Sequence, residues 1–288
     1  MSSIVYLNGQ YLLKDEARIS PEDRGFIFGD GVYEATRALS GKLFEWPRHA
    51  KRLQWSLGEL KIKPAIAMGE LEKISLTLLE KNGLAQEAIV YLQITRGAAP
   101  RTHVFPPASV PCTVYLTASA FTPPHDLRKT GARVITVPDQ RWTRCDLKTV
   151  NLLPAVLAKQ QAQEAGAFEA VLTRDGVMIE GAYSSIFGVV NGVIRTHPLN
   201  QRILAGVTRE VVVEIVRELK LPFEEKPIAL AEVPNLSELF LTSSGNDVLP
   251  IAALDGNKIG NGMPGPVAQQ LYAALAKRMH GKGVPLAA

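Results

Sequence analysis

A lysine and a glutamate in the middle of the chain have the types and spacing to carry chemistry on a carbonyl group. Lys148 is the one cation in residues 145–153, and Glu180 follows it thirty-two positions later, just before Gly181. Burial lowers the pKa of an amine, and a deprotonated amine attacks a carbonyl carbon to form a Schiff base. In pyridoxal phosphate chemistry, a carboxylate keeps the ring nitrogen of the cofactor protonated. The pair suggests such a site, although a solvated lysine and a glutamate in a turn give the same spacing.

The length and composition of the chain are those of a globular protein with two domains. It has 288 residues, of which 46% are hydrophobic and 21% are charged, so it can bury a substantial core. No stretch approaches the roughly eighteen continuous apolar residues of a membrane span. The first residues also lack the basic start and the apolar run of a signal peptide. We expect a cytoplasmic protein that does not associate with membranes.

The cysteines, histidines and basic residues form no recognisable site. Cys112 and Cys145 lack a CxxC or zinc-like spacing, which fits buried small residues in a reducing compartment. The five histidines are scattered, which argues against a bound metal. The net charge of +4 is spread without a basic run, which argues against a nucleic-acid partner. A mildly basic solvated surface and a pocket for a small phosphate and a carboxylate both remain open.

Turn and helix signals predict a mixed α+β arrangement in the first part of the chain. Asn-Gly and Ser-Gly pairs between β-prone runs indicate tight hairpins, and apolar residues at helical spacing indicate two helices. The predicted elements are hairpin turns at Asn8-Gly9 and Ser40-Gly41, strands at 33–38, 43–46, 89–95 and 112–118, and helices at 48–61 and 69–82.

Two adjacent prolines mark the boundary between the domains. Pro123 and Pro124 can continue neither a helix nor a central strand, so we place a linker at residues 121–127 between domains at 1–120 and 128–288. The second domain is also mixed, and the whole chain is predicted as an α/β (mixed α+β) protein. Its predicted elements are strands at 134–137, 169–173 and 177–179, turns at Asp175-Gly176 and Asn191-Gly192, and a helix at 155–165. A second helix is predicted to begin after Thr208, with Thr208 as its N-cap.

Two segments of the second domain could hold a phosphate. Gly206 and Thr208 lie at the mouth of a predicted helix, where backbone N–H groups and a hydroxyl can converge on an anion. Ser243 and Ser244 lie in a hydroxyl-rich turn after a predicted strand and could supply the remaining donors. An ordinary helix cap and an ordinary polar turn are the alternatives.

One loop of the first domain could bind a carboxylate. Arg101 and His103 are two residues apart after a predicted strand, and guanidinium groups bind carboxylates with two hydrogen bonds. A solvated basic loop is the alternative. The glycines of residues 23–34 do not match the G-x-G-x-x-G dinucleotide pattern and are interpreted as packing positions. We find no Ser-His-Asp arrangement in the sequence.

Taken together, six segments in this order resemble the class IV pyridoxal phosphate aminotransferases, a family with the two-domain fold called fold type IV. The resemblance covers nearly the whole chain. Within the family it is greatest to the D-amino-acid aminotransferases, because Pro100–His103 looks like their carboxylate-binding arginine and histidine. The segments are 23–34, 96–106, 141–153, 180–188, 203–210 and 240–244.

The resemblance implies a role for each matching residue and a homodimer. Lys148 matches the lysine that forms the Schiff base and moves the proton, and Glu180 matches the carboxylate on the ring nitrogen. In the family, the cofactor lies at the domain interface, and the arginine and histidine that bind the substrate carboxylate come from the neighbouring subunit. The matching phosphate-binding residues are Arg52, Val207, Thr208, Ser243 and Ser244, and the matching substrate-binding residues are Tyr33, Arg101 and His103.

The reaction implied is transamination between a D-amino acid such as D-alanine and a 2-oxo acid such as 2-oxoglutarate. One departure bears on the substrate: Ala182 and Tyr183 stand where the D-amino-acid enzymes have small hydroxyl residues. The alternatives within the family are a branched-chain L-amino-acid aminotransferase, an (R)-amine transaminase and aminodeoxychorismate lyase. Outside enzymes, the alternative is a cofactor-binding protein without turnover.

Overall fold

The computed structural model describes residues 3–281, which form two compact units. Of the described residues, the first unit comprises 3–122 together with Leu147–Asn151, and the second comprises Pro123–Asp146 and 152–281. The short segment around Lys148 therefore packs with the N-terminal unit, whereas the predicted domains assign it to the C-terminal one. In the described part of the chain, no helix is long and apolar enough to cross a membrane.

A six-stranded sheet forms the centre of the first unit, with the strand order β2-β1-β6-β5-β3-β4. Its neighbouring strands are antiparallel. The Asn8-Gly9 turn closes the first hairpin as predicted, with positive φ at both residues. The strands are β1 (Ile4–Leu7), β2 (Gln10–Leu13), β3 (Gly31–Leu39), β4 (Lys42–Leu43), β5 (Glu87–Thr95) and β6 (Thr113–Ala120).

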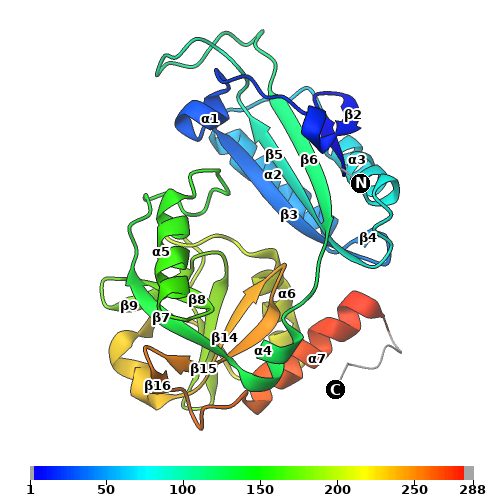
Figure 1. Ribbon diagram of the computed structural model, residues 1–288. Coiled ribbons are helices and arrows are strands. Elements are labelled where there is room, and N and C mark those ends of the chain that lie inside the picture. The colour runs from blue at the N-terminus through cyan, green and yellow to red at the C-terminus, as the bar shows by residue number, and fades with distance from the viewer. Residues whose placement is uncertain (1–2, 282–288) are drawn as a thin grey trace. The chain divides into compact units, whose positions relative to one another are not determined.

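Two amphipathic helices, α2 (Trp46–Glu59) and α3 (Met68–Lys81), cover one face of this sheet (Figure 1). Alternate residues of β5 and β6 point into the core beneath them, as the period of two along a strand requires. Residues 43–46 were predicted as a strand, but β4 ends at Leu43 and Trp46 begins α2, because Pro47 suits the first turn of a helix. The unit also contains the short helices η1 (Lys14–Glu16) and α1 (Arg24–Phe28).

The second unit is built on a ten-stranded sheet that is mostly antiparallel, with parallel pairs at β7/β8, β7/β15 and β11/β12. The hairpins at Asp175-Gly176 and Asn191-Gly192 are confirmed. The strands are β7 (Ala132–Pro138), β8 (Glu169–Arg174), β9 (Val177–Gly181), β10 (Ser185–Val190), β11 (Val193–Thr196), β12 (Phe223–Glu225), β13 (Ile228–Ala229), β14 (Leu236–Ser243), β15 (Asp247–Leu254) and β16 (Asn257–Lys258).

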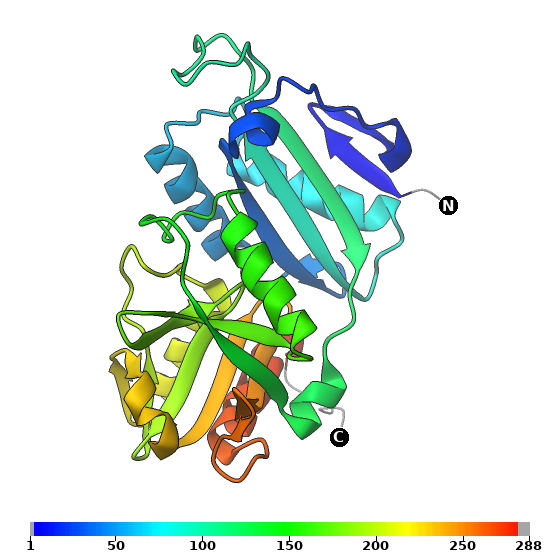
Figure 2. The same cartoon turned by 60° about the vertical axis from the view of Figure 1, so that its left-hand side comes forward.

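Three long helices pack on this sheet. Helix α5 (Leu153–Glu164) lies along β7 and β8, while α6 (Val207–Glu218) and α7 (Pro266–His280) pack against each other and against β14 (Figure 2). Two shorter helices are α4 (His125–Thr130) and η2 (Leu230–Asn235). Helix α4 occupies part of the predicted linker, because Pro124 takes the N-cap position before it and does not interrupt it.

A carboxylate from the sheet caps the C-terminal helix α7. Glu238 accepts hydrogen bonds from the backbone N–H groups of Val267 and Ala268, both at 2.9 Å. We expect Glu238→Ala to lower the free energy of unfolding by about 1–2 kcal/mol, since two helix-end amides lose their acceptor. Urea denaturation followed by circular dichroism measures this loss. Glu238→Gln keeps one acceptor oxygen and should lose less, and equal losses would contradict the capping role.

Candidate active site

The backbone of Lys148 is fixed against the first unit at two points. Its carbonyl accepts a hydrogen bond from the N–H of Tyr33 at 3.0 Å, and its own N–H donates to the Ser56 hydroxyl of α2 at 3.1 Å. Thr149 continues this pairing as an isolated bridge to Val32. The Lys148 Nζ atom lies 4.1 Å from the centroid of the Tyr33 ring. The lysine side chain is therefore held at the start of β3, next to a tyrosine that was predicted to bind substrate.

A buried carboxylate one residue after Tyr33 orients Arg52. The Arg52 guanidinium donates two hydrogen bonds of 2.7 Å to Glu34, and His49 Nδ1 lies 2.7 Å from the same carboxylate. Glu34 is inaccessible to solvent. Burial raises the pKa of its carboxyl, but Arg52 and His49 outweigh burial and hold the pKa at about 2. Burial lowers the pKa of His49, which leaves the imidazole neutral at pH 7. Glu34 thus keeps Arg52 in one orientation at any physiological pH.

The predicted carboxylate-binding pair lies on an exposed loop of the same unit. The Arg101 guanidinium carbon is 5.5 Å from the centroid of the Phe28 ring, and the His103 ring centroid is also 5.5 Å from that of Phe28. The structure therefore brings Arg101 and His103 together around one aromatic side chain. Tyr33, the third residue predicted to bind substrate, stacks on a different ring, that of Tyr91, with 5.7 Å between the centroids.

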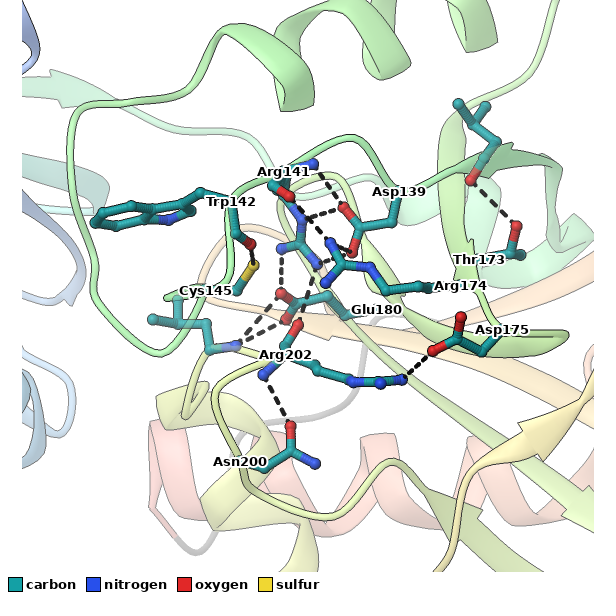
Figure 3. Close-up of polar contacts among 12 residues, drawn as sticks. Asp139, Arg141, Trp142, Cys145, Thr173, Arg174, Asp175, Glu180, Asn200 and Arg202 are labelled. Carbon is teal, nitrogen blue, oxygen red and sulfur yellow. Dashed lines mark hydrogen bonds and ion pairs between the residues drawn. The ribbon is translucent and has the colours of Figure 1, made fainter.

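In the second unit, Glu180 of β9 is buried and held from two directions (Figure 3). The Arg141 guanidinium donates to one of its oxygens, and the N–H of Leu204 lies 3.3 and 3.2 Å from the two oxygens. Burial raises the pKa of the Glu180 carboxyl, and Arg141 opposes that rise. Through Leu204, the carboxylate also fixes the loop that leads into α6.

The start of α6 has the features of a phosphate site. Gly206 is the N-cap and provides no side-chain acceptor, so the first amides of the helix are available to an anion. A Cβ atom at Gly206 would approach the Ser185 hydroxyl to 2.8 Å, so a larger residue would crowd this end of the helix. The prediction that Thr208 caps the helix is wrong, because Val207 and Thr208 are its first two residues. Thr208 is buried in the first turn.

The end of β14 adds hydroxyl groups from a strand that pairs with β10. Thr242 is opposite Ser185, and its buried Oγ1 finds no hydrogen-bond partner within the described part of the chain. Ser243 follows at the end of the strand, and its hydroxyl accepts from the N–H of Asn246 at 3.1 Å. Uncapped amides, hydroxyls and an orphaned buried donor are the groups that bind a phosphate. The donor set fits the phosphate of pyridoxal phosphate, and residues 3–281 hold no cluster able to bind a metal.

The turn after Glu180 contains the residues that depart from the family pattern. Tyr183 is half exposed, and its neighbour Ser184 lies 3.3 Å from the buried Glu169 carboxylate. Burial raises the pKa of Glu169 to about 7, and burial together with Glu169 raises the pKa of Tyr183. The polar contacts of this turn are therefore made to the protein interior, and the Tyr183 ring is left at the surface of its own unit.

Comparison with known proteins finds relatives along nearly the whole chain. The family model described as amino-transferase class IV matches residues 31–254. A D-alanine aminotransferase from Staphylococcus haemolyticus is 38% identical over 273 residues, which cover 95% of this chain and 96% of that protein. One from Bacillus licheniformis is 40% identical over 273 residues, or 94% and 95% of the two chains. The T.th. branched-chain amino acid aminotransferase complexed with N-(5'-phosphopyridoxyl)-L-glutamate has a TM-score of 0.88 at 26% identity, covering 98% of this chain and 96% of that one.

The chain belongs to the class IV aminotransferase family. This membership confirms the predicted family and the mixed α+β fold of fold type IV. It also confirms the predicted enzyme class and cofactor: the protein is an aminotransferase that depends on pyridoxal phosphate.

Proposed function

We propose that the protein transfers the amino group of a D-amino acid, with D-alanine as the representative donor, to a 2-oxo acid such as 2-oxoglutarate. The observation that carries the proposal is Lys148, held by its backbone beside Tyr33. The similarity at 38–40% identity to two D-alanine aminotransferases supports the choice of donor. The products are pyruvate from D-alanine and D-glutamate from 2-oxoglutarate.

When bound, pyridoxal phosphate supplies a carbonyl carbon for an amine and a protonated ring that accepts the electron pair released at the substrate Cα. In this proposal, Lys148 is the amine and the group that removes and returns the Cα proton. Glu180 accepts the N–H of the ring nitrogen and so keeps that nitrogen protonated. The residues proposed to bind the phosphate are Arg52, Val207, Thr208, Ser243 and Ser244.

Arg101, His103 and Tyr33 are proposed to hold the substrate carboxylate, which decides which bond at Cα faces Lys148. We expect Arg101→Ala to raise the KM for D-alanine roughly 10- to 100-fold, since a charge-assisted hydrogen bond contributes about 1.5–3 kcal/mol. The affinity for pyridoxal phosphate should stay unchanged. Steady-state kinetics and a cofactor titration measure the two effects. Arg133→Ala, an exposed arginine of β7, is the matched control, and full D-alanine activity in Arg101→Ala would remove Arg101 from the proposed site.

The absorption spectrum of the purified holoenzyme tests the function directly. The visible band of the lysine-bound cofactor is recorded before and after addition of D-alanine and, separately, of L-leucine. We expect bleaching by D-alanine alone, with pyruvate released on addition of 2-oxoglutarate. Bleaching by L-leucine alone would contradict the proposed donor and indicate a branched-chain L-amino-acid aminotransferase. Bleaching by neither amino acid would exclude both, and an aryl-ethylamine and aminodeoxychorismate would then be the next donors.

We further propose that the protein is a cytoplasmic homodimer whose subunits share active-site residues. Both cysteines are free thiols, which suits a reducing compartment. Helix α5 exposes an apolar stripe at helical spacing, with 68% of Leu153, 56% of Val156 and 55% of Leu157 accessible. Such stripes mark protein interfaces. In light scattering we expect the wild-type mass to be twice 31.3 kDa.

Charge placed in this stripe tests whether it is buried between subunits. We expect the double variant Val156→Glu and Leu157→Glu to shift the mass toward the monomer, because association would bury two unpaired carboxylates. Gln270→Glu, at an exposed position of α7, adds a charge on another helix and should remain dimeric. A dimeric double variant would show that α5 lies outside the interface.

A further inference from the structure

Two partly buried arginines and two buried carboxylate groups alternate in a chain that ends at Glu180 (Figure 3). Asp139, at the end of β7, accepts from Arg141 Nε at 2.9 Å and from Arg141 Nη2 at 3.0 Å. Its Oδ1 atom also accepts from the Arg141 backbone N–H at 3.0 Å, and Arg174 lies 3.1 Å from Oδ2. The Asp139 side chain is fully buried. The third guanidinium nitrogen of Arg141, Nη1, donates to Glu180.

From this geometry we propose that Asp139 is a positioning residue that acts on the ring nitrogen of pyridoxal phosphate through Arg141 and Glu180. The inference rests on the role proposed for Glu180 and adds a residue that this role does not include. Asp139 accepts from two of the three guanidinium nitrogens, so the plane of the group is fixed and the third nitrogen, Nη1, faces Glu180. Glu180 accepts from Arg141 and from the N–H of Leu204, and its two oxygens keep lone pairs for a further donor, which in this proposal is the N–H of the ring.

The charge of Asp139 has a second effect on Glu180. Arg141 alone would compensate Glu180 fully, and a fully compensated carboxylate attracts a protonated ring nitrogen weakly. Asp139 shares the positive charge of Arg141, so more negative potential remains at Glu180. Arg174 acts in the opposite direction because it neutralises part of Asp139. The other polar groups close to this network are the buried Cys145 thiol, which donates to the Trp142 carbonyl, and the Arg202–Asp175 pair, whose Arg202 carbonyl accepts from Arg141.

The test is the protonation of the ring nitrogen, read by ¹⁵N NMR of holoenzyme reconstituted with ¹⁵N-labelled pyridoxal phosphate across pH 6–10. The ¹⁵N shift reports the proton on that atom independently of turnover. We expect Asp139→Asn to lower the pH at which the nitrogen loses its proton by about one unit, since one charge near the site is removed. Arg174→Gln should raise that pH, and Glu180→Gln should lower it more than Asp139→Asn does.

Asp146→Asn is the matched control, because Asp146 also binds an arginine two residues away through two hydrogen bonds, from Arg144 at 3.0 and 2.9 Å. It should titrate as the wild type. A wild-type titration of Asp139→Asn beside a shifted Glu180→Gln would overturn the inference and leave the proposed function intact. No shift in Glu180→Gln would overturn the role of Glu180 and the inference with it. If Asp139→Asn does not fold, Arg174→Gln decides, and an unchanged or lowered pH in that variant would overturn the inference.

Discussion

The Lys148→Ala variant is expected to lose transamination of D-alanine by at least about 10³-fold in kcat, with its fold unchanged. A positioned acid or base alone contributes roughly 10²–10⁴ to a rate, and the same amine is also the proposed nucleophile. The fold should persist because Lys148 is anchored through its backbone: the carbonyl accepts from Tyr33, and the N–H donates to Ser56. Neither hydrogen bond uses the side chain that the substitution removes.

Stopped-flow and steady-state assays with saturating pyridoxal phosphate measure the loss, and circular dichroism reports the fold. Lys148→Arg keeps the positive charge but supplies no neutral amine, so it should be as inactive as Lys148→Ala. Lys159→Ala is the matched control: Lys159 is also a partly buried lysine, and it packs on the rings of Phe168 and Tyr183. A Lys148→Ala enzyme that retains more than a few per cent of wild-type kcat would remove Lys148 from the catalytic role.

Local signals in the sequence predicted most of the fold. The glycine turns and the alternation along β5 and β6 depend only on neighbouring residues, and they appear in the structure within a residue or two. Helix α7 was not predicted, although Pro266 at its start and the apolar residues Leu271 and Leu275 at helical spacing are local signals of a helix. The position of Lys148 was also not predicted, since it depends on the bridge between Thr149 and Val32.

The sequence likewise predicted only part of the candidate site. Residue types and their spacing predicted that Lys148, Glu180 and the start of α6 belong to the site. The side chains that orient these groups were not predicted. Arg141 and Glu180 are thirty-nine positions apart, and only the fold makes them neighbours. For Glu34 a signal existed: the period of two along β3 places it on the buried face with Val32. A carboxylate at such a position requires a buried cation, and that argument would have led to Arg52.

Replacing Glu34 is expected to produce the largest loss of stability in the first unit. Glu34→Gln keeps the shape of the side chain but removes the negative charge that pairs with the Arg52 guanidinium in the interior. Removing one partner of a buried ion pair costs about 3–5 kcal/mol. The pKa of about 2 is consistent with this size, since a fall from 4.5 corresponds to about 3 kcal/mol. Urea denaturation of the apoprotein at pH 7 measures the loss free of any cofactor contribution.

The same carboxylate sets a pH dependence whose sign follows from its lowered pKa. The unfolded chain binds a proton at Glu34 near pH 4.5, and the folded protein does so only near pH 2. The stabilisation is therefore complete above about pH 4.5 and is lost as the pH falls toward 2. We expect the difference in unfolding free energy between wild type and Glu34→Gln to shrink over this range, because glutamine does not titrate.

Glu87→Gln separates this effect from the general acid sensitivity of the protein. Glu87 also pairs with an arginine of β3, the buried Arg37, but 28% of its own side chain is exposed. Water reaches that pair, and exposed or partly exposed ion pairs contribute about 0–1 kcal/mol. Glu87→Gln should therefore cost far less than Glu34→Gln at pH 7 and should show little change with pH. Equal costs for the two variants would mean that burial does not set the strength of the Glu34–Arg52 pair, and Arg52 would then have to be held for a phosphate by some other contact.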